Sequence, residues 1–151
     1  MVSDFGCDEK NYELLNDPKR NREHNSLYGS ALSKCDIQDP SGDWKGKAWY
    51  RFVEPAGTGL ADSLVPWKHC GGHAVGWLNG TLPADLDLGE IITRQVCFRW
   101  SGVHCYWQID VKIKQCNEFF LYELPQTQMI KSKFNINDTL ICSHRPHYCG
   151  Q

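Results

Sequence analysis

Apolar and polar side chains alternate strictly from Cys105 to Lys114, and this is the clearest pattern in the chain. The positions of one face are Cys105, Trp107, Ile109, Val111 and Ile113. The positions of the other face are Tyr106, Gln108, Asp110, Lys112 and Lys114. Because successive side chains of a strand point to opposite faces, this alternation predicts a half-buried β-strand.

Turn signals on both sides extend this strand into two hairpins. Residues 90–100 predict a further strand, and Ser101-Gly102 predicts the turn that joins it to the alternating run. At the other end, Asn117-Glu118 predicts a turn into a strand at residues 119–124, which Pro125 ends. Two antiparallel hairpins with one buried face each need a second layer to cover them.

The N-terminal half of the chain is less regular. Residues 48–53 (A-W-Y-R-F-V) predict a strand, and residues 61–66 are a candidate for another short one. Residues 8–32 are polar and are interrupted by Asn16-Asp17-Pro18, so they predict an irregular arm. The whole pattern predicts a mainly β fold, an antiparallel β-sandwich-like single domain with an irregular N-terminal arm.

The eight cysteines change this picture most, because their number is even and they are spread over the whole chain. None belongs to a C-x-x-C pair, so they indicate a disulfide-rich framework in an oxidising compartment rather than a zinc ribbon. The first residues lack the basic and apolar regions of a signal peptide, which alone would favour the cytosol. We therefore interpret residues 1–6 as a tail or expression start, and residues 7–151 as a domain of a secreted or membrane-anchored protein.

Length and charge exclude several classes of partner. A chain of 151 residues suits one domain with its own core. A formal charge of −2 argues against a nucleic-acid partner, and no apolar run approaches the roughly 18 residues of a membrane span.

Two segments match the N-x-[ST] pattern for N-glycosylation. They begin at Asn79, in Asn79-Gly80-Thr81, and at Asn137, in Asn137-Asp138-Thr139. Since Asn-Gly is also a strong turn signal, we expect Asn79 to be exposed at a turn.

Acidic and histidine-rich segments give no ligand set with a known spacing. Asp85, Asp87 and Glu90 could offer oxygens to calcium, but they lack the spacing of a calcium loop. The histidines near cysteines or glycines are His69, His73, His104, His144 and His147. We expect solvated acids and surface or packing histidines, with neither a metal nor an organic cofactor.

The six tryptophans are the stronger candidates for ligand contacts. No serine lies in a G-x-S-x-G segment, and oxidised cysteines are not nucleophiles, so the sequence shows no enzyme signature. Exposed tryptophans can bind a sugar or a protein. The alternation places Trp107 inward, whereas Trp44 and Trp67 lie in loop contexts and are the predicted ligand-binding residues.

Five segments in a fixed order carry a family resemblance. They are W-Y-R-F-V (49–53), W-L-N-G-T-L-P (77–83), V-C-F-R-W-S-G-V-H-C-Y-W (96–107), V-K-I-K-Q-C (111–116) and the closing C-x6-C (142–149). Their order and spacing resemble the cysteine-rich extracellular domain of the uromodulin family. With weaker matches upstream, the resemblance covers almost the whole chain.

The resemblance implies a disulfide pairing that spacing alone leaves open. The implied pairs are Cys7–Cys116, Cys35–Cys142, Cys70–Cys149 and Cys97–Cys105. Ser63 and His104 stand where ten-cysteine members have a fifth pair, so one complete disulfide is absent. The resemblance also implies a glycan at Asn79, with Trp77 packed beneath it, but gives no support for one at Asn137.

These features together predict an extracellular, non-catalytic module for adhesion or recognition. It would present an N-glycan or bind an extracellular protein or glycan through a shallow patch rather than a deep polar cleft. Two alternatives stay open. One is a lectin in which Trp44 and Trp67 stack on sugar, and the other is a small secreted enzyme with an unrecognised site.

Overall fold

The computed structural model describes residues 6–24, 43–66, 69–70, 74–82, 86–100, 102–127 and 146–151. Within these ranges the chain forms a seven-stranded sheet and two short 3-10 turns. The turns are η1 (Glu9–Asn11) and η2 (Pro18–Arg20). The strands are β1 (Glu13–Leu15), β2 (Ala48–Phe52), β3 (Ala74–Asn79), β4 (Ile91–Trp100), β5 (Val103–Gln115), β6 (Phe120–Leu124) and β7 (Pro146–Tyr148). The predicted mainly β fold is confirmed.

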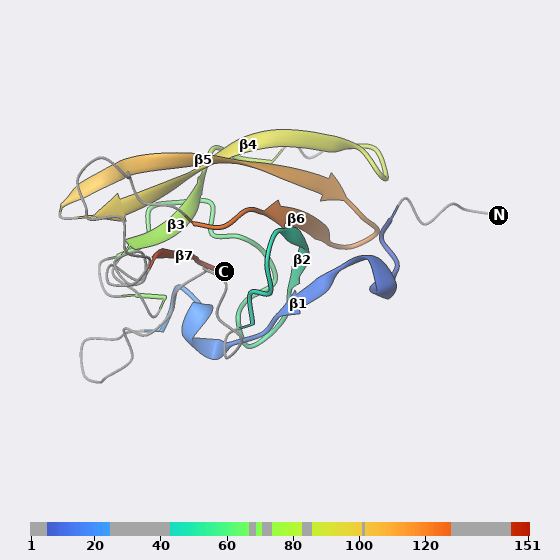
Figure 1. The fold of residues 1–151 in the computed structure, drawn as a ribbon, viewed down its shortest axis with the longest axis horizontal. Helices are drawn as coiled ribbons and strands as arrows, with labels where there is room; N and C mark the ends of the chain where they lie inside the picture. Colours follow the sequence, from blue (N-terminus) through green and yellow to red (C-terminus); the bar gives the residue numbers. More distant parts are fainter. Residues whose placement is uncertain are drawn as a thin grey trace.

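The long β4–β5 hairpin forms the centre of the sheet (Figure 1). Its register pairs Val96 with Ile109 and Phe98 with Trp107, and the predicted inward positions are buried or half-buried. Lys114 was predicted to face solvent, yet it is almost fully buried. Its Nζ lies 4.6 Å from the centroid of the Trp49 ring, and this cation–π contact removes the ammonium from water.

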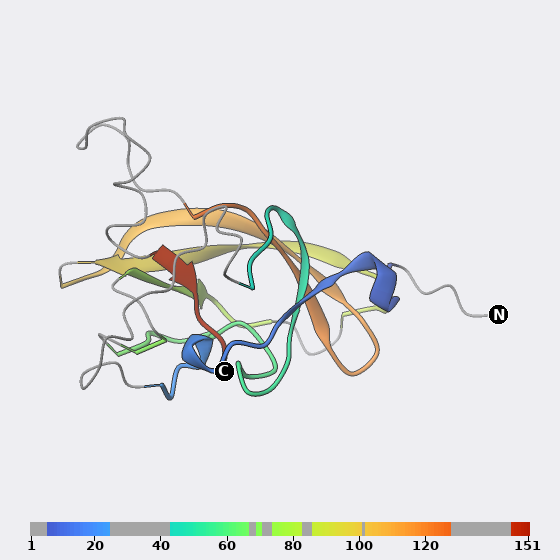
Figure 2. The same cartoon turned by 60° about the horizontal axis from the view of Figure 1, so that its bottom comes forward.

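Two arms of the sheet leave this hairpin at opposite ends. The strand order is β1-β2-β6-β5-β4-β3-β7. β6 pairs only with residues 112–115 of β5, whereas β3 pairs with residues 95–98 of β4. The sheet therefore curves strongly, so that the β6-β2-β1 arm and the β3-β7 arm lie on the same side of the hairpin (Figure 2). This arrangement of one curved sheet is compatible with the predicted sandwich-like packing.

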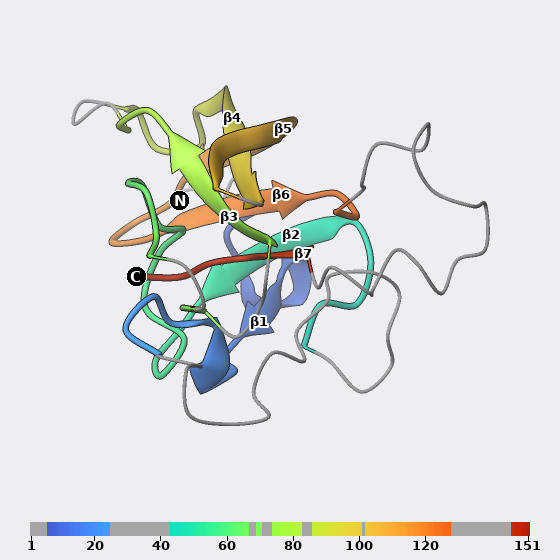
Figure 3. The ribbon, with the colours of Figure 1, turned by 90° about the vertical axis from the view of Figure 1, so that its left-hand side faces the viewer.

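The hydrophobic core fills the space between the two arms. Phe52 and Tyr122 come from one arm, and their rings meet edge to face at 5.6 Å. Phe98 stacks on Trp107 at 4.9 Å and also contacts Tyr148 of β7. All five side chains belong to a single buried cluster, so the two arms share one core. Figure 3 shows the two arms with the β4–β5 hairpin seen end on.

Residues 148–151 connect the two arms. The amide of Cys149 donates to the Gly76 carbonyl of β3 at 3.0 Å, and the amide of Gly150 donates to the Arg20 carbonyl at 2.8 Å. The amide of Gln151 donates to the Gly59 carbonyl at 2.8 Å. A Cβ atom at Gly150 would collide with the Ala56 carbonyl and the Phe52 ring, so only glycine permits this close approach.

Three short strands were not predicted, and one predicted strand is absent. Residues 61–66 form no strand. Ala61 still makes two backbone hydrogen bonds: its amide donates to the carbonyl of Cys149, just after β7, and its carbonyl accepts from the amide of Leu78 in β3. β1 and β7 have only three residues each, too few for a periodic signal. β3 lacks alternation because the core covers one of its faces and a second cluster around Val75 covers the other.

Arg20 is a fully buried cation that ties η2 to β7. Its Nη2 and Nε donate to the two carboxylate oxygens of Asp43 at 2.6 and 3.3 Å. Its Nη1 donates to the Tyr148 carbonyl at 2.8 Å. Because the guanidinium is paired at three nitrogens, the cost of burying it is offset in the native state.

We expect Arg20→Met to lower the free energy of unfolding by about 3–5 kcal/mol, because it removes the cation paired with the Asp43 carboxylate and the N–H that donates to the Tyr148 carbonyl. Urea denaturation with disulfides intact measures the loss. The matched control is Lys47→Met, which breaks a pair with Glu123 at 4.0 Å whose lysine side chain is 65% exposed. Its expected loss is below about 1 kcal/mol. Equal losses for both variants would contradict the role given to Arg20.

Tyr122 is a second buried polar side chain, and its ionisation is suppressed. Burial raises the pKa of Tyr122 to about 12, a hydrogen bond with the Leu60 backbone lowers the pKa in part, and the Asp62 carboxylate raises it. The unfolded chain would titrate near the ordinary value of 10.0. The neutral hydroxyl therefore contributes stability that is fully present below pH 10 and is lost as the pH rises towards 12.

We expect the native protein to lose stability between pH 10 and 11.5 more steeply than Tyr122→Phe, which lacks the ionisable group. The extra loss should reach about 2 kcal/mol, since each pKa unit corresponds to about 1.4 kcal/mol. Urea unfolding at several pH values with brief alkaline exposure gives both curves. Parallel curves would show that Tyr122 ionises equally easily in the folded and unfolded states.

Candidate functional site

Three disulfides join cysteines of the described residues, and two of them tie the N-terminal arm and the 148–151 segment to the rest of the domain. The structure joins Cys7 to Cys116, Cys70 to Cys149 and Cys97 to Cys105, with Cα–Cα distances of 5.8, 5.6 and 4.9 Å. These are three of the four implied pairs. The first closes 109 residues between the N-terminal arm and the end of β5, so it should stabilise the fold by about 4–5 kcal/mol in the chain-entropy model. The fourth pair, Cys35–Cys142, lies outside the described residues.

The positions of the missing fifth pair carry polar contacts instead. Ser63 and His104 are both exposed. The Ser63 hydroxyl accepts a hydrogen bond from Arg22 Nη1 at 2.7 Å. The His104 carbonyl accepts one from Trp77 Nε1 at 3.3 Å. Both positions therefore have local partners without a disulfide.

Asn79 lies where β3 ends, and its side chain is exposed. The preceding Leu78 is buried in the core, so alternation along the strand directs Asn79 away from the core. Gly80 follows with φ of 127°, a conformation that side chains rarely adopt, and begins the turn. The half-buried Trp77 packs against the second cluster on the same face of β3 as Asn79. The second acceptor, Asn137, lies outside the described residues.

Trp44 is not a surface residue, which corrects its prediction as a ligand contact. Its side chain is only 3% exposed and belongs to the main core. Its Nε1 donates to the Leu124 carbonyl at the end of β6, at 3.2 Å. A loop tryptophan with this distant partner is a structural residue rather than a binding residue. Trp67, the other predicted contact, lies outside the described residues.

Two of the acids and histidines that were considered as metal ligands make local contacts instead. Glu90 caps a turn, because its Oε1 accepts from the Asp87 amide at 3.2 Å. The Nδ1 atom of His69 lies 2.7 Å from the Arg22 carbonyl. Asp85, His73 and His144 lie outside the described residues. In the part of the chain that the structure describes, no group of three His, Cys, Asp or Glu residues could hold a metal ion.

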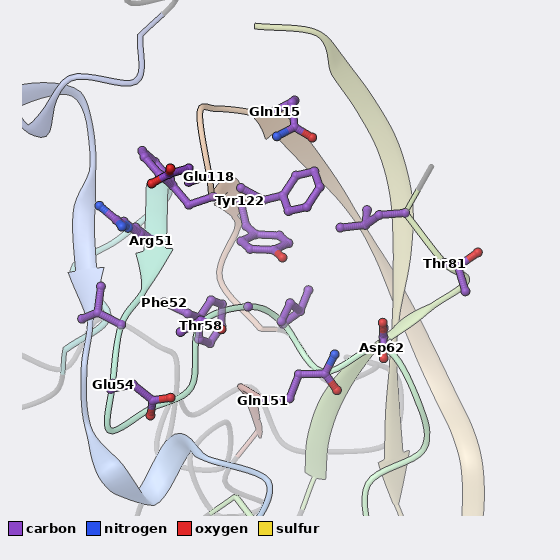
Figure 4. A pocket seen from close by; sticks show the side chains of 16 residues that line it. Arg51, Phe52, Glu54, Thr58, Asp62, Thr81, Gln115, Glu118, Tyr122 and Gln151 are labelled. Carbon is purple, nitrogen blue, oxygen red and sulfur yellow. The ribbon is translucent and has the colours of Figure 1, made fainter. Parts of the chain in front are cut away.

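A broad groove of about 1040 Å³ lies beside the core, and sequence reasoning did not find it. Its walls come from β2, the 58–62 loop, the turn after β3, the β5–β6 turn and Gln151 (Figure 4). Its size exceeds the shallow patch that was expected. The groove-lining charged residues are Arg51, Glu54, Asp62 and Glu118.

The charged groups of the groove differ in their contacts and exposure. Arg51 is held: its guanidinium lies 3.9 Å from the centroid of the Phe119 ring, and its Nη1 donates to the Tyr12 hydroxyl at 3.2 Å. Glu54, Asp62 and Glu118 are exposed. Glu118 has φ of 70°, so the tight β5–β6 turn places this residue at the edge of the groove. Glu118 is distant in sequence from Glu54 and Asp62, and the fold brings all three to one groove.

Comparison with known proteins shows the same relationship as the cysteine pattern. The sequence pattern of the "Uromodulin-like, D8C domain" matches residues 50–136. The pancreatic secretory granule membrane major glycoprotein GP2 of Canis lupus familiaris is 39% identical over 120 residues, covering 78% of this chain and 21% of that protein. The corresponding protein of Homo sapiens is 38% identical over 120 residues, covering 78% of this chain and 20% of that protein. Uromodulin of Rattus norvegicus is 33% identical over 116 residues, covering 76% of this chain and 16% of that protein.

The chain spans about a fifth of the length of these curated relatives. The secretory and membrane terms in the name of the pancreatic protein agree with the predicted extracellular location. The match over residues 50–136 includes β2 to β6, the groove walls that they form, Asn79 and the Cys97–Cys105 pair. The chain therefore belongs to the uromodulin-like D8C domain family.

Proposed function

We propose that the chain is an extracellular, non-catalytic recognition module that presents an N-glycan on Asn79. The observation that carries the proposal is the placement of Asn79 on a covalently fixed sheet. Its side chain is exposed at the end of β3, and β3 is paired on both sides, with β4 and β7. A glycan attached there would project from a rigid strand without disturbing the core.

The disulfide frame supports the extracellular location. Disulfides persist in oxidising compartments and are rare in the cytosol. Within the described residues no cysteine is free. In the same part of the chain, no helix is long and apolar enough to cross a membrane.

The positions of the candidate residues favour recognition over the two alternatives. The lectin alternative required Trp44 at the surface, and Trp44 is in the core. The enzyme alternative required convergent nucleophiles or acid–base pairs. The described cysteines serve in disulfides, and Glu54, Asp62 and Glu118 come from three separate segments around an open groove. This arrangement therefore favours the presentation of a glycan or the docking of a partner at the surface over catalysis.

The test uses the Asn137→Gln variant, in which the pattern at Asn79 is the remaining N-glycosylation acceptor. The variant is secreted from mammalian cells that add high-mannose glycans. We expect glycopeptide mass spectrometry to find a glycan on Asn79 and expect the folded protein to bind the mannose-specific lectin concanavalin A. Adding Asn79→Gln should abolish lectin binding while leaving the urea unfolding midpoint nearly unchanged, because the side chain makes no core contact.

The matched control adds Asn117→Gln, which changes an exposed asparagine that lies outside any acceptor pattern. This control should keep both the glycan and the lectin binding. An unmodified Asn79 in the secreted, disulfide-bonded protein would refute the proposed presentation of a glycan. A substrate turned over by the same preparation would refute the non-catalytic role.

A further inference from the structure

Asn79 is not among the residues that line the groove between β2, the β5–β6 turn and Gln151. We infer that this groove docks a basic segment, bearing arginine or lysine, of an extracellular protein partner. The inference rests on the proposed recognition role and specifies its second surface, separate from Asn79.

Three carboxylates at the groove have no partner of their own. Glu54, Asp62 and Glu118 are exposed and line the groove from three different segments. Within the described part of the chain, none of these carboxylates accepts a hydrogen bond or forms an ion pair. Figure 4 shows Glu54 and Glu118 on one side of the groove and Asp62 on the opposite side, so the negative charges surround the opening.

Arg51 offsets only one of these three negative charges, and no ion pair among the described residues joins it to them. Arg51 is fixed on the Phe119 ring and bonded to the Tyr12 hydroxyl. It shares the lining with three carboxylates, so the groove keeps a formal charge of −2. A negative cleft attracts a cationic ligand and repels an anionic one such as a sialylated or sulfated sugar.

The remaining lining suits the apolar part of a long basic side chain. The half-buried side chains of Phe120 and Leu82 line the groove, whereas the Tyr122 ring, which is 2% exposed, adds little accessible surface. Figure 4 shows the Tyr122 ring in the interior of the groove, between the charged residues of the two sides. Arginine and lysine pack their methylene stems on such surfaces while their charged ends reach carboxylates, and aromatic faces attract their cations.

Size and geometry distinguish a peptide from a metal ion. A volume of about 1040 Å³ is at the upper end of small-ligand pockets, and it accommodates several side chains. Among the described residues, no three acidic groups are close enough together to coordinate a metal. Charges spread around a wide opening fit several cationic side chains of one segment.

The test titrates the ¹⁵N-labelled native domain with the probe peptide acetyl-(Gly-Arg)₄-amide and follows amide chemical shifts. We expect saturable shifts at the 51–54, 58–62 and 118–120 segments, and weaker binding as NaCl rises from about 20 to about 300 mM, because screening weakens charge pairs. The peptides acetyl-(Gly-Gln)₄-amide and acetyl-(Gly-Glu)₄-amide should cause no saturable shifts.

A charge-matched pair of variants separates the groove from the overall charge. The groove variant carries Glu54→Gln, Asp62→Asn and Glu118→Gln, and we expect it to bind the arginine peptide at least about tenfold more weakly. The control variant carries Glu9→Gln, Asp110→Asn and Glu23→Gln at exposed positions outside the groove, and it should bind within about twofold of the native domain.

Several results would overturn the inference. They are no binding of the arginine peptide at low salt, equal weakening in both triple variants, and preferential binding of a neutral high-mannose oligosaccharide to the groove segments. Unglycosylated refolded domain suffices for the titration. A negative titration would therefore not contradict the proposed glycan on Asn79. A missing glycan would likewise not contradict the inferred binding at the groove.

Discussion

The docking of residues 148–151 between the two arms of the sheet is the constraint on which the rest of the structure depends. Arg20 holds the Tyr148 carbonyl, the Cys70–Cys149 disulfide anchors the next residue, and the Gly150 amide donates back to the Arg20 carbonyl. The Gln151 carbonyl accepts from the amides of residues 58 and 59. Without this segment, β3 would lose the hydrogen bond at its Gly76 carbonyl and the loop at 58–62 would lose its hydrogen bonds to Gln151, so the groove would lose a wall.

The sequence predicts those parts of the fold that carry their signal locally. The alternation in β5 and the turns on either side identify two hairpins, because a half-buried strand records its two faces in its own residues. β3 leaves no such record, since both of its faces are covered. Trp44 was misplaced for a related reason: its buried position depends on the Leu124 carbonyl, which is distant in sequence. The pairing of the cysteines came from family resemblance, because spacing leaves many connectivities open.

The two candidate surfaces differ in the same way. The acceptor pattern at Asn79 is contiguous, so the sequence identifies it, and the structure adds its exposure at the end of a fixed strand. The groove includes Glu54, Asp62 and Glu118 in its lining, and only the folded chain brings Glu118 to the same groove as the other two. Exposed acids in loops are common, and nothing in their local sequence distinguishes these three. Neither Asn79 nor the three groove acids take part in the described disulfides or in the Arg20–Asp43 pair, so these stabilising contacts do not depend on the two proposed surfaces.

Hydrogen exchange of the native domain tests the central role of the 148–151 segment most directly. An edge strand of three residues would ordinarily open early and exchange fast. If this segment holds the two arms together, the amides of Cys149, Gly150 and Gln151 should exchange at rates within about tenfold of those in the β4–β5 hairpin. Exchange of these three amides as fast as in an open loop, while the hairpin stays protected, would contradict the account.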